Sequence, residues 1–345
     1  MPAHNFAHYR GRLEYLNIDS TVLWNNRLGD PSHRDVAVYL PEGYDQSDES
    51  YPLMVDLAGF TGSGFSHLGW KAFGENLPQR VDRLIAEEKM GPVILVMPDC
   101  FTSLGGNQYI NSAVMGNWSD FLLQEMLPTV TGRFRVLPGA EHRAVFGKSS
   151  GGYGALMQGM LTAEHWGAVA CHSGDMAFDL VYRADFPGTL MHLSRYGGSV
   201  ERFMKRIGST RAVTGNEMHT LMVLAMAASY DPDPDAPYGV RLPVTEDTCE
   251  LIEERWKNWL SWDPLTKVQE PEVQERLKSL KGLFIDCGDQ DQYNLLFGAR
   301  RLHRELSVAG INHHYEEFDD NHSGIDYRMD VSLPYLYECI AGPLR

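Results

Sequence analysis

A glycine- and serine-rich run between an apolar stretch and a helix-compatible stretch is the feature that most constrains the fold of this chain. The run reads Gly147-Lys148-Ser149-Ser150-Gly151, with the apolar residues 144–146 before it and the residues 155–160 after it. A strand, a very tight turn and a helix in this order hold the central residue in a strained backbone conformation, so the flanking positions need glycine. The pattern predicts a nucleophile elbow with Ser149 at its apex. A glycine-rich turn without chemistry is the alternative.

The length and the charge of the chain limit the classes of protein to which it can belong. Its 345 residues, 43% of them hydrophobic, suffice for one large α/β domain with an insertion or for two domains. The net charge of −16 argues against binding to nucleic acid or to anionic membranes, because both need basic surfaces. We therefore expect a small-molecule partner, with no nucleic acid and no membrane.

The cysteines and the first residues bear on the cellular compartment. The five cysteines are far apart and form no Cys-x-x-Cys motif, which disfavours structural zinc and favours reduced thiols. The N-terminal residues 1–6 contain no apolar run, so we expect no signal peptide, and no stretch has the length and apolarity of a transmembrane helix. These features together predict a cytoplasmic protein.

Apolar runs alternate with amphipathic stretches along most of the chain. The first of them predict a hairpin of two strands, and the later ones are typical of buried strands, each followed by a helix. The expected strands span 11–18, 35–40, 53–57, 93–97, 143–146, 168–171, 283–285 and 314–318, and the expected helices span 77–89, 120–130, 150–161, 295–308 and 331–340. Repeated strand–helix units predict an α/β fold with a mostly parallel sheet and helices on both faces.

The segment 176–258 interrupts this alternation after the sixth expected strand, so we divide the chain into a first core part (1–175), a helical cap (176–258) and a second core part (259–345). The segment has a helical pattern, and methionines recur in it at Met176, Met191, Met204, Met218, Met222 and Met226. An insertion at this point lies over the carboxyl edge of the sheet, where open α/β folds bind ligands, and methionine-rich surfaces adapt to apolar groups. The alternative is a helical subdomain with its own core, whose apolar helix could also form a homodimer interface.

The carboxylate that would complete a serine site is expected in the loop after the strand at 283–285. A serine hydroxyl becomes a good nucleophile only beside a base, and an acid must orient that base. Asp291 lies just past the strand end, beyond the turn at Gly288, so its side chain is expected in the crevice. Asp289 and Asp286 are the competing carboxylates, because Asp289 could cap the turn and Asp286 lies at the strand end.

The predicted base is His322, which lies in a loop of Asp, Asn, Ser and Gly residues after the strand at 314–318. A loop at this point faces the same crevice as the loops that follow the other parallel strands. His313 and His314 begin the preceding strand, so we expect them at the opposite edge of the sheet.

An oxyanion hole would need two backbone N–H groups that point at the developing negative charge. One is expected from Ser150, directly after the nucleophile. The second is expected from the glycine-rich loop at 57–64, where Phe60 is our candidate. A phosphate cradle is the alternative for this loop, but it needs a following lysine or a correctly spaced acidic residue, and neither fits well.

Short motifs outside the insertion also occur together in one known family. They are Val-Tyr-Leu-Pro-Glu-Gly-Tyr at 38–44, Leu-Ala-Gly-Phe-Thr at 57–61, the helix at 117–128, the elbow at 147–154, Gly-x-x-Asp at 288–291 and Asn-His-Ser at 321–323. With them the chain resembles the putative-esterase family of α/β-hydrolases, which includes esterase D (S-formylglutathione hydrolase), feruloyl and acetyl-xylan esterases, enterochelin esterases and mycolyltransferases. The resemblance implies an α/β-hydrolase fold and supports Asp291 over Asp289.

Two departures from this family bear on the substrate. Lys148 precedes the predicted nucleophile where esterase D-like members usually carry His, and the insertion 176–258 is much longer than the corresponding segment of esterase D. Both argue against a glutathione thioester. Lys148 itself is expected at the pocket edge or in a structural role, because His322 is available as the base.

Residues and resemblance together predict a serine carboxylesterase that acts on short-chain or aryl carboxylic esters through an acyl-enzyme, with Ser149, His322 and Asp291 as its triad. An acyltransferase or an S-acylglutathione hydrolase with the same triad is one alternative. A non-catalytic α/β-hydrolase that binds a ligand is another. No metal and no organic cofactor are implied.

Overall fold

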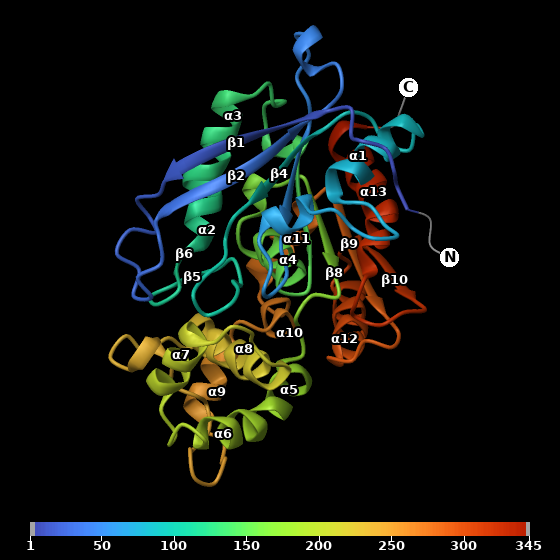
Figure 1. The fold of residues 1–345 in the computed structure, drawn as a ribbon. Coiled ribbons are helices and arrows are strands. Elements are labelled where there is room, and N and C mark those ends of the chain that lie inside the picture. The colour runs from blue at the N-terminus through green and yellow to red at the C-terminus, as the bar shows by residue number, and fades with distance from the viewer. Residues whose placement is uncertain (1–3, 343–345) are drawn as a thin grey trace.

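An eight-stranded sheet forms the centre of the molecule (Figure 1). The computed structural model describes residues 4–342. The strands are β1 (Arg12–Asp19), β2 (His33–Leu40), β3 (Leu53–Leu57), β4 (Ile94–Pro98), β7 (Arg143–Lys148), β8 (Ala168–His172), β9 (Gly282–Gly288) and β10 (His314–Phe318), in the order β1-β2-β4-β3-β7-β8-β9-β10. The β1–β2 and β2–β4 pairs are antiparallel and all the others are parallel. The predicted hairpin and mostly parallel sheet are confirmed.

Helices cover both faces of this sheet (Figure 1). Neighbouring side chains of a strand point to opposite faces, so Val38 and Tyr39 of β2 belong to separate apolar clusters. The cluster that contains Tyr39 includes residues of α1 (Leu77–Ala86) and α13 (Met329–Ala341). The cluster that contains Val38 includes residues of α3 (Leu127–Arg133), α4 (Ser150–Leu161), α11 (Pro271–Ser279) and α12 (Leu295–Val308). Because helices cover both faces of the sheet, the sequences of the central strands are continuous apolar runs.

Some elements differ in extent from the prediction. The helix expected over 120–130 is longer and consists of α2 (Trp118–Asp120), a π-helical segment (Phe121–Met126) and α3. The helix expected over 77–89 ends at Ala86, because Glu88 has a φ of 57° and leaves the helical path. Helix α11 and the ribbon of β5 (Asn111–Ser112) and β6 (Gly116–Asn117) were not predicted. Two-residue strands carry too little periodicity to be recognised in a sequence.

The insertion after β8 forms helices beyond the carboxyl ends of the parallel strands, at the bottom of Figure 1. They are α5 (Phe178–Val181), α6 (Phe186–Ser194), α7 (Val200–Ser209), α8 (Gly215–Tyr230) and α9 (Glu253–Leu260), with α10 (Pro264–Lys267) leading back to the core. Trp259 of α9 packs edge-on against the rings of Tyr182 and Phe186, at 5.8 and 5.5 Å between ring centroids. Helix α9 therefore straddles residue 258, where the insertion was expected to end, and packs with the insertion.

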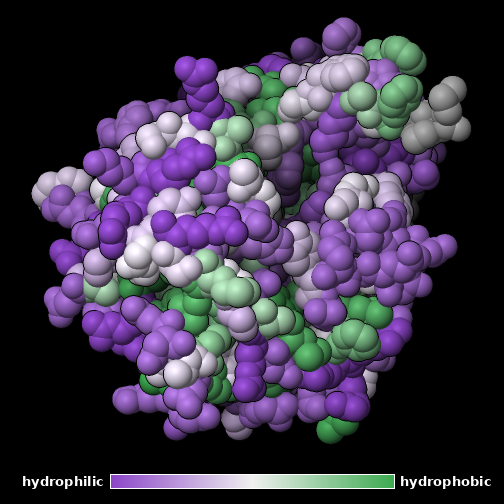
Figure 2. Space-filling model, turned by 60° about the horizontal axis from the view of Figure 1, so that its bottom comes forward, coloured by the Kyte–Doolittle hydropathy of each residue, from purple (hydrophilic) through white to green (hydrophobic). Residues whose placement is uncertain are grey.

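The side of the molecule that carries the insertion is mainly hydrophilic at its surface, with hydrophobic residues gathered in the lower half of Figure 2. Met226 of α8 is buried, whereas Met191 of α6 is exposed. Within residues 4–342, no helix combines the length and the apolarity that crossing a membrane would require.

The turn between β7 and α4 packs its backbone directly on β3. Ser149 in this turn has a φ of 58° and a ψ of −127°, a conformation that costs free energy in a residue with a side chain. A Cβ atom on Gly151 would collide with the carbonyl oxygen of Leu57, and one on Gly147 would lie 2.5 Å from the same oxygen. The predicted strand–turn–helix geometry, with glycine required on both sides of the serine, is confirmed.

Gly151→Ala is expected to lower the free energy of unfolding by about 3 kcal/mol or more, because the added methyl group must displace the backbone of β3. The matched control is Gly208→Ala in α7, where an added Cβ meets no atom within 4 Å. This control gains up to about 1 kcal/mol of helix stability. Urea unfolding followed by circular dichroism measures both changes, and equal stability of the two variants would contradict the packing described for Gly151.

Candidate active site

A cavity of about 370 Å³ lies where the carboxyl ends of the strands meet the insertion. Residues that follow β3, β7, β8, β9 and β10 all contribute to its wall, together with side chains from α5 and α8. Among them are Phe60, Ser149, Ser150, Asp175, Tyr182, Met222, Tyr293 and His322. This is the position at which open α/β sheets bind ligands. The cavity therefore brings together the loops that the sequence singled out.

Ser149 is half-buried at the start of α4, and its backbone is held on both sides. Its N–H donates to the carbonyl oxygen of His172 (2.9 Å), and its own carbonyl accepts from the N–H of Tyr153 (2.8 Å). These bonds fix the strained turn, so that the serine lines the cavity. The first turn of α4 also directs its free N–H groups and the positive end of its dipole toward this point.

His322 and Asp291 form a hydrogen-bonded pair next to the cavity. His322 Nδ1 lies 2.8 Å from Asp291 Oδ2, and the N–H of Tyr293 donates to Asp291 Oδ1 (2.9 Å). The backbone N–H of His322 donates to Gln292 Oε1 (2.9 Å). Because Nδ1 is taken by the carboxylate, Nε2 is the ring nitrogen that remains for a proton transfer. Both side chains are buried, which keeps the pair away from bulk water.

The competing carboxylates lie elsewhere. Asp289 is exposed on the turn. Asp286 is buried in β9, where His172 Nδ1 (2.6 Å) and Arg328 Nε (2.9 Å) contact its two oxygens. Asp291 is thus the carboxylate that the structure brings to His322. His314 begins β10 and pairs in register with Phe284, at the amino end of the parallel strands, as expected.

Phe60 and Ser150 line the cavity beside Ser149, and the backbone N–H of each has no acceptor among residues 4–342. The loop that carries Phe60 packs on the turn, since a Cβ on Gly59 would lie 3.4 Å from the Cβ of Ser149. Thr61, one residue further, is already engaged, because its N–H donates to the carbonyl of Gly105 (2.8 Å). The arrangement leaves Phe60 and Ser150 free to donate to an oxygen in the cavity.

Lys148 lies at the edge of the cavity with its Nζ 3.8 Å from Asp326 Oδ1. Asp326 also pairs with Lys71. Burial by itself would raise the pKa of Asp326, but the two lysines outweigh it and lower that pKa. Lys148 thus combines the two roles expected for it, because it lines the cavity edge and belongs to a structural ion-pair cluster.

Sequence reasoning missed a second carboxylate in the cavity. Asp175 lies three residues after β8 and contacts Tyr182, Gln108 and Ser150. Burial raises the pKa of Asp175, although the hydrogen bonds from Tyr182 and Gln108 act in the opposite direction. The signal that could have found it is the one used for Asp291: a carboxylate shortly after a strand end, beside a glycine.

The insertion supplies an apolar wall and one imidazole. Met218, His219 and Met222 of α8 and Val181 of α5 line the cavity. Other methionines of the insertion, Met226 among them, are buried in the apolar cluster that the insertion shares with one face of the sheet. The insertion therefore presents a face to the cavity, and its buried side chains continue the apolar cluster on one face of the sheet.

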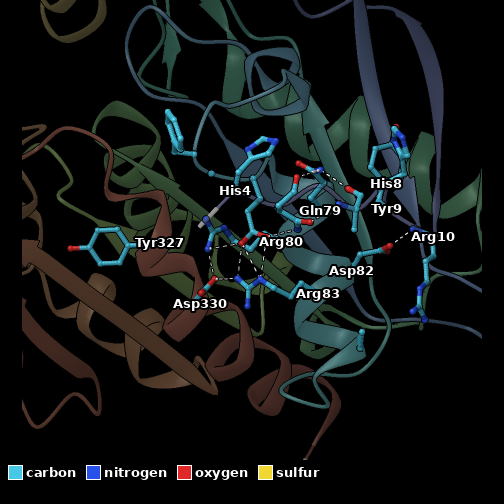
Figure 3. Close-up of a pocket in the computed structure, with 16 residues that line it drawn as sticks. His4, His8, Tyr9, Arg10, Gln79, Arg80, Asp82, Arg83, Tyr327 and Asp330 are labelled. Carbon is cyan, nitrogen blue, oxygen red and sulfur yellow. Dashed lines mark hydrogen bonds and ion pairs between the residues drawn. The ribbon is translucent and has the colours of Figure 1, made fainter. Parts of the chain in front are cut away.

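A second hollow, of about 580 Å³, lies between the segment before β1, α1 and α13 (Figure 3). Arg80 and Arg83 turn toward Asp330 there, and Arg83 also pairs with Glu75. The charges of Arg80 and Arg83 are therefore matched by Asp330 and Glu75. Within residues 4–342, no cluster of three or more His, Cys, Asp or Glu side chains is arranged to hold a metal ion.

Asp175→Asn is expected to stabilise the fold more at about pH 8 than at about pH 4. Since the pKa of Asp175 is raised in the folded state, the wild type is most stable below the unfolded-state pKa and loses stability as the pH rises through the folded-state value. The neutral amide avoids this loss. Urea unfolding at both pH values measures it, with the exposed Asp289→Asn as control. A pH-independent effect of Asp175→Asn would rule out the buried charge.

Comparisons with known proteins point to one family. The family described as Putative esterase matches residues 30–331 of the chain. Esterase Rv1288 of Mycobacterium tuberculosis (strain ATCC 25618 / H37Rv) is 32% identical over 178 residues, which cover 48% of this chain and 33% of that protein. An endo-1,4-beta-xylanase/feruloyl esterase of Xylanibacter ruminicola is 28% identical over 152 residues, or 43% of this chain and 20% of that protein. The chain thus spans only a minor part of the length of these relatives.

Solved structures share the fold at lower sequence identity. A ferulic acid esterase superimposes with a TM-score of 0.60 at 19% identity, over 96% of this chain and 100% of that one. An S-formylglutathione hydrolase from Agrobacterium tumefaciens gives a TM-score of 0.58 at 14% identity, over 98% and 99% of the two chains. This likeness shows the α/β-hydrolase fold. Since the family match runs from the hairpin through the insertion to the last helix, the chain belongs to the Putative esterase family.

Proposed function

We propose that this protein is a serine carboxylesterase. The observation that carries the proposal is that Ser149, on a strained turn, lines the same cavity as Phe60, Ser150 and His322. His322 is paired with Asp291, and the backbone N–H groups of Phe60 and Ser150 are free to donate. A nucleophile, an oriented base and donors for an oxyanion are the groups that acyl transfer through a covalent intermediate needs.

In the proposed reaction Ser149 Oγ attacks the ester carbonyl carbon while His322 Nε2 accepts the hydroxyl proton. Asp291 holds the imidazole in the tautomer that leaves Nε2 free and stabilises its positive charge. The N–H groups of Phe60 and Ser150 donate to the oxyanion of the tetrahedral intermediate. His322 then protonates the departing alcohol, and a water molecule activated by the same nitrogen releases the carboxylic acid and regenerates Ser149.

The proposed substrates are short-chain or aryl carboxylic esters. The cavity of about 370 Å³ is at the small end for ligand sites. Its wall from α8 contains methionines, which adapt to flat or branched apolar groups. Relatives named as feruloyl esterases are consistent with an aryl group in the substrate.

Ser149→Ala is expected to lower kcat/KM for p-nitrophenyl esters by about three orders of magnitude or more, because only the oxyanion donors and binding would remain. The measurement is initial rates on the acetate, butyrate and octanoate, and the preferred chain length reports the size of the acyl site. Ser307→Ala, on the exposed side of α12, is the control and is expected to keep the wild-type rate.

Analysis of the products distinguishes between the reactions that these residues could catalyse. Release of free acid in the presence of added alcohols supports hydrolysis, whereas a new ester as the main product would identify an acyltransferase. Faster turnover of S-acylglutathione than of oxygen esters would identify a thioester hydrolase. A wild-type protein without turnover of any of these compounds would contradict the proposed function and leave a ligand-binding role.

Asp291→Asn is expected to reduce kcat by about two to four orders of magnitude, because the amide no longer favours the productive tautomer of His322. Asp289→Asn removes the same charge two residues earlier and is expected to change kcat by less than about twofold, since its side chain is exposed. The two variants are compared by steady-state kinetics on the preferred ester. A larger loss in Asp289→Asn would reassign the acid.

A further inference from the structure

Asp175 contributes a carboxylate to the cavity wall that the proposed reaction does not use. Only 7% of its surface is exposed. Its Oδ2 atom accepts from the Tyr182 hydroxyl (2.8 Å), from Gln108 Nε2 (3.2 Å) and from the Ser150 hydroxyl (3.4 Å). These donors come from three separate parts of the chain. The carboxylate is therefore held firmly, in one orientation.

The other oxygen of this carboxylate, Oδ1, accepts no hydrogen bond from residues 4–342. Because Oδ2 is occupied by the protein's own donors and Asp175 lines the cavity, Oδ1 is the atom left for a ligand. Polar atoms of largely buried side chains in native proteins nearly always have partners, so Oδ1 is an acceptor that the cavity wall offers to a ligand.

Among residues 4–342, no positive side chain is paired directly with Asp175, although attraction to His322 acts against the effect of burial on its pKa. The nearest candidates are already engaged, because Lys148 pairs with Asp326 and His322 with Asp291. Within residues 4–342, no arginine, lysine or histidine forms an ion pair with Asp175, and burial raises its pKa. A buried carboxylate with neutral donors only is costly to a fold, and such groups concentrate at functional sites.

We propose that Asp175 Oδ1 accepts a hydrogen bond from a hydroxyl group of the substrate, so that the preferred esters carry an alcoholic or phenolic hydroxyl in the part that fills the cavity. The inference rests on the proposed esterase function and adds the substrate class to it. A hydroxyl group has one proton to donate and needs one acceptor. An ammonium group has three, and the neighbouring wall of Val181, Met218 and Met222 offers it no second acceptor.

The test uses matched esters that differ in one substituent. One series consists of 4-nitrophenyl 3-phenylpropanoates and the other of phenethyl acetates, with hydrogen, hydroxyl, methoxy or aminomethyl placed in turn at each ring position. The first series puts the substituent in the acyl part and the second in the alcohol part. At one position the wild type is expected to prefer hydroxyl over methoxy by about tenfold or more in kcat/KM, because methoxy cannot donate.

Asp175→Asn is expected to bring that hydroxyl-to-methoxy ratio to within about twofold of unity. The amide oxygen of Asn can replace Oδ2 toward Tyr182, Gln108 and Ser150, and its NH₂ group then faces the cavity and can donate to either substituent. Asp289→Asn is the charge-matched control, since Asp289 is exposed and does not line the cavity, and its variant is expected to keep the wild-type ratio. Ratios are taken within each variant, so an overall change in activity cancels.

Asp175→Ala is the second variant if Asp175→Asn does not fold, and it is expected to lose the preference as well. A wild-type ratio near unity at every position, or an unchanged ratio in the variants, would overturn the subsite and leave the esterase proposal intact. A preference for aminomethyl over hydroxyl would also overturn it.

Absence of hydrolysis of all these esters would instead count against the proposed function. In that case thermal shifts of the wild type with the matched phenethyl alcohols test the subsite, with the same expected preference for the hydroxyl-bearing ring.

Discussion

The arrangement of groups at the cavity depends on the backbone contact between Gly151 and the carbonyl group of Leu57. It lets the turn after β7 lie directly against the end of β3, at a separation that leaves no room for a side chain. The loop after β3 therefore meets the turn, and the free N–H groups of Phe60 and Ser150 come to the same side as Ser149. The packed sheet offsets the strain of the serine backbone, which would not persist in an isolated turn.

Three buried carboxylates near this edge of the sheet differ only in what surrounds them. Asp286 is matched by Arg328 and His172, so its role is structural. Asp291 contacts His322, and Asp175 contacts neutral donors alone. The same side chain can therefore serve as an ion-pair partner, as the proposed acid of a triad and as the proposed acceptor for a substrate hydroxyl. Neighbouring charges and burial, rather than residue type, separate these roles.

One helix of the insertion, α8, packs against the core and also lines the cavity. One face of α8 packs into the aromatic cluster around Trp259, where Tyr230 lies 5.6 Å from it between ring centroids. Another face presents Met218 and Met222 to the cavity. This double contact requires apolar side chains on both of these faces of the helix, because each of them packs against other parts of the protein. The insertion is thus packed against the site, and its side chains bear on the size of the proposed substrate.

Local patterns were enough to predict most strands and helices, the turn at Ser149 and the loop position of His322, because periodicity and glycine content depend on adjacent residues. They favoured Asp291 as the acid but left Asp289 and Asp286 open, and the resemblance added support for Asp291 over Asp289. They missed Asp175 altogether. Its environment includes Gln108 and Ser150, which are distant from Asp175 along the chain and reach it only in the folded structure. A sequence specifies which groups are present near a strand end, whereas partners, burial and free lone pairs arise from tertiary packing.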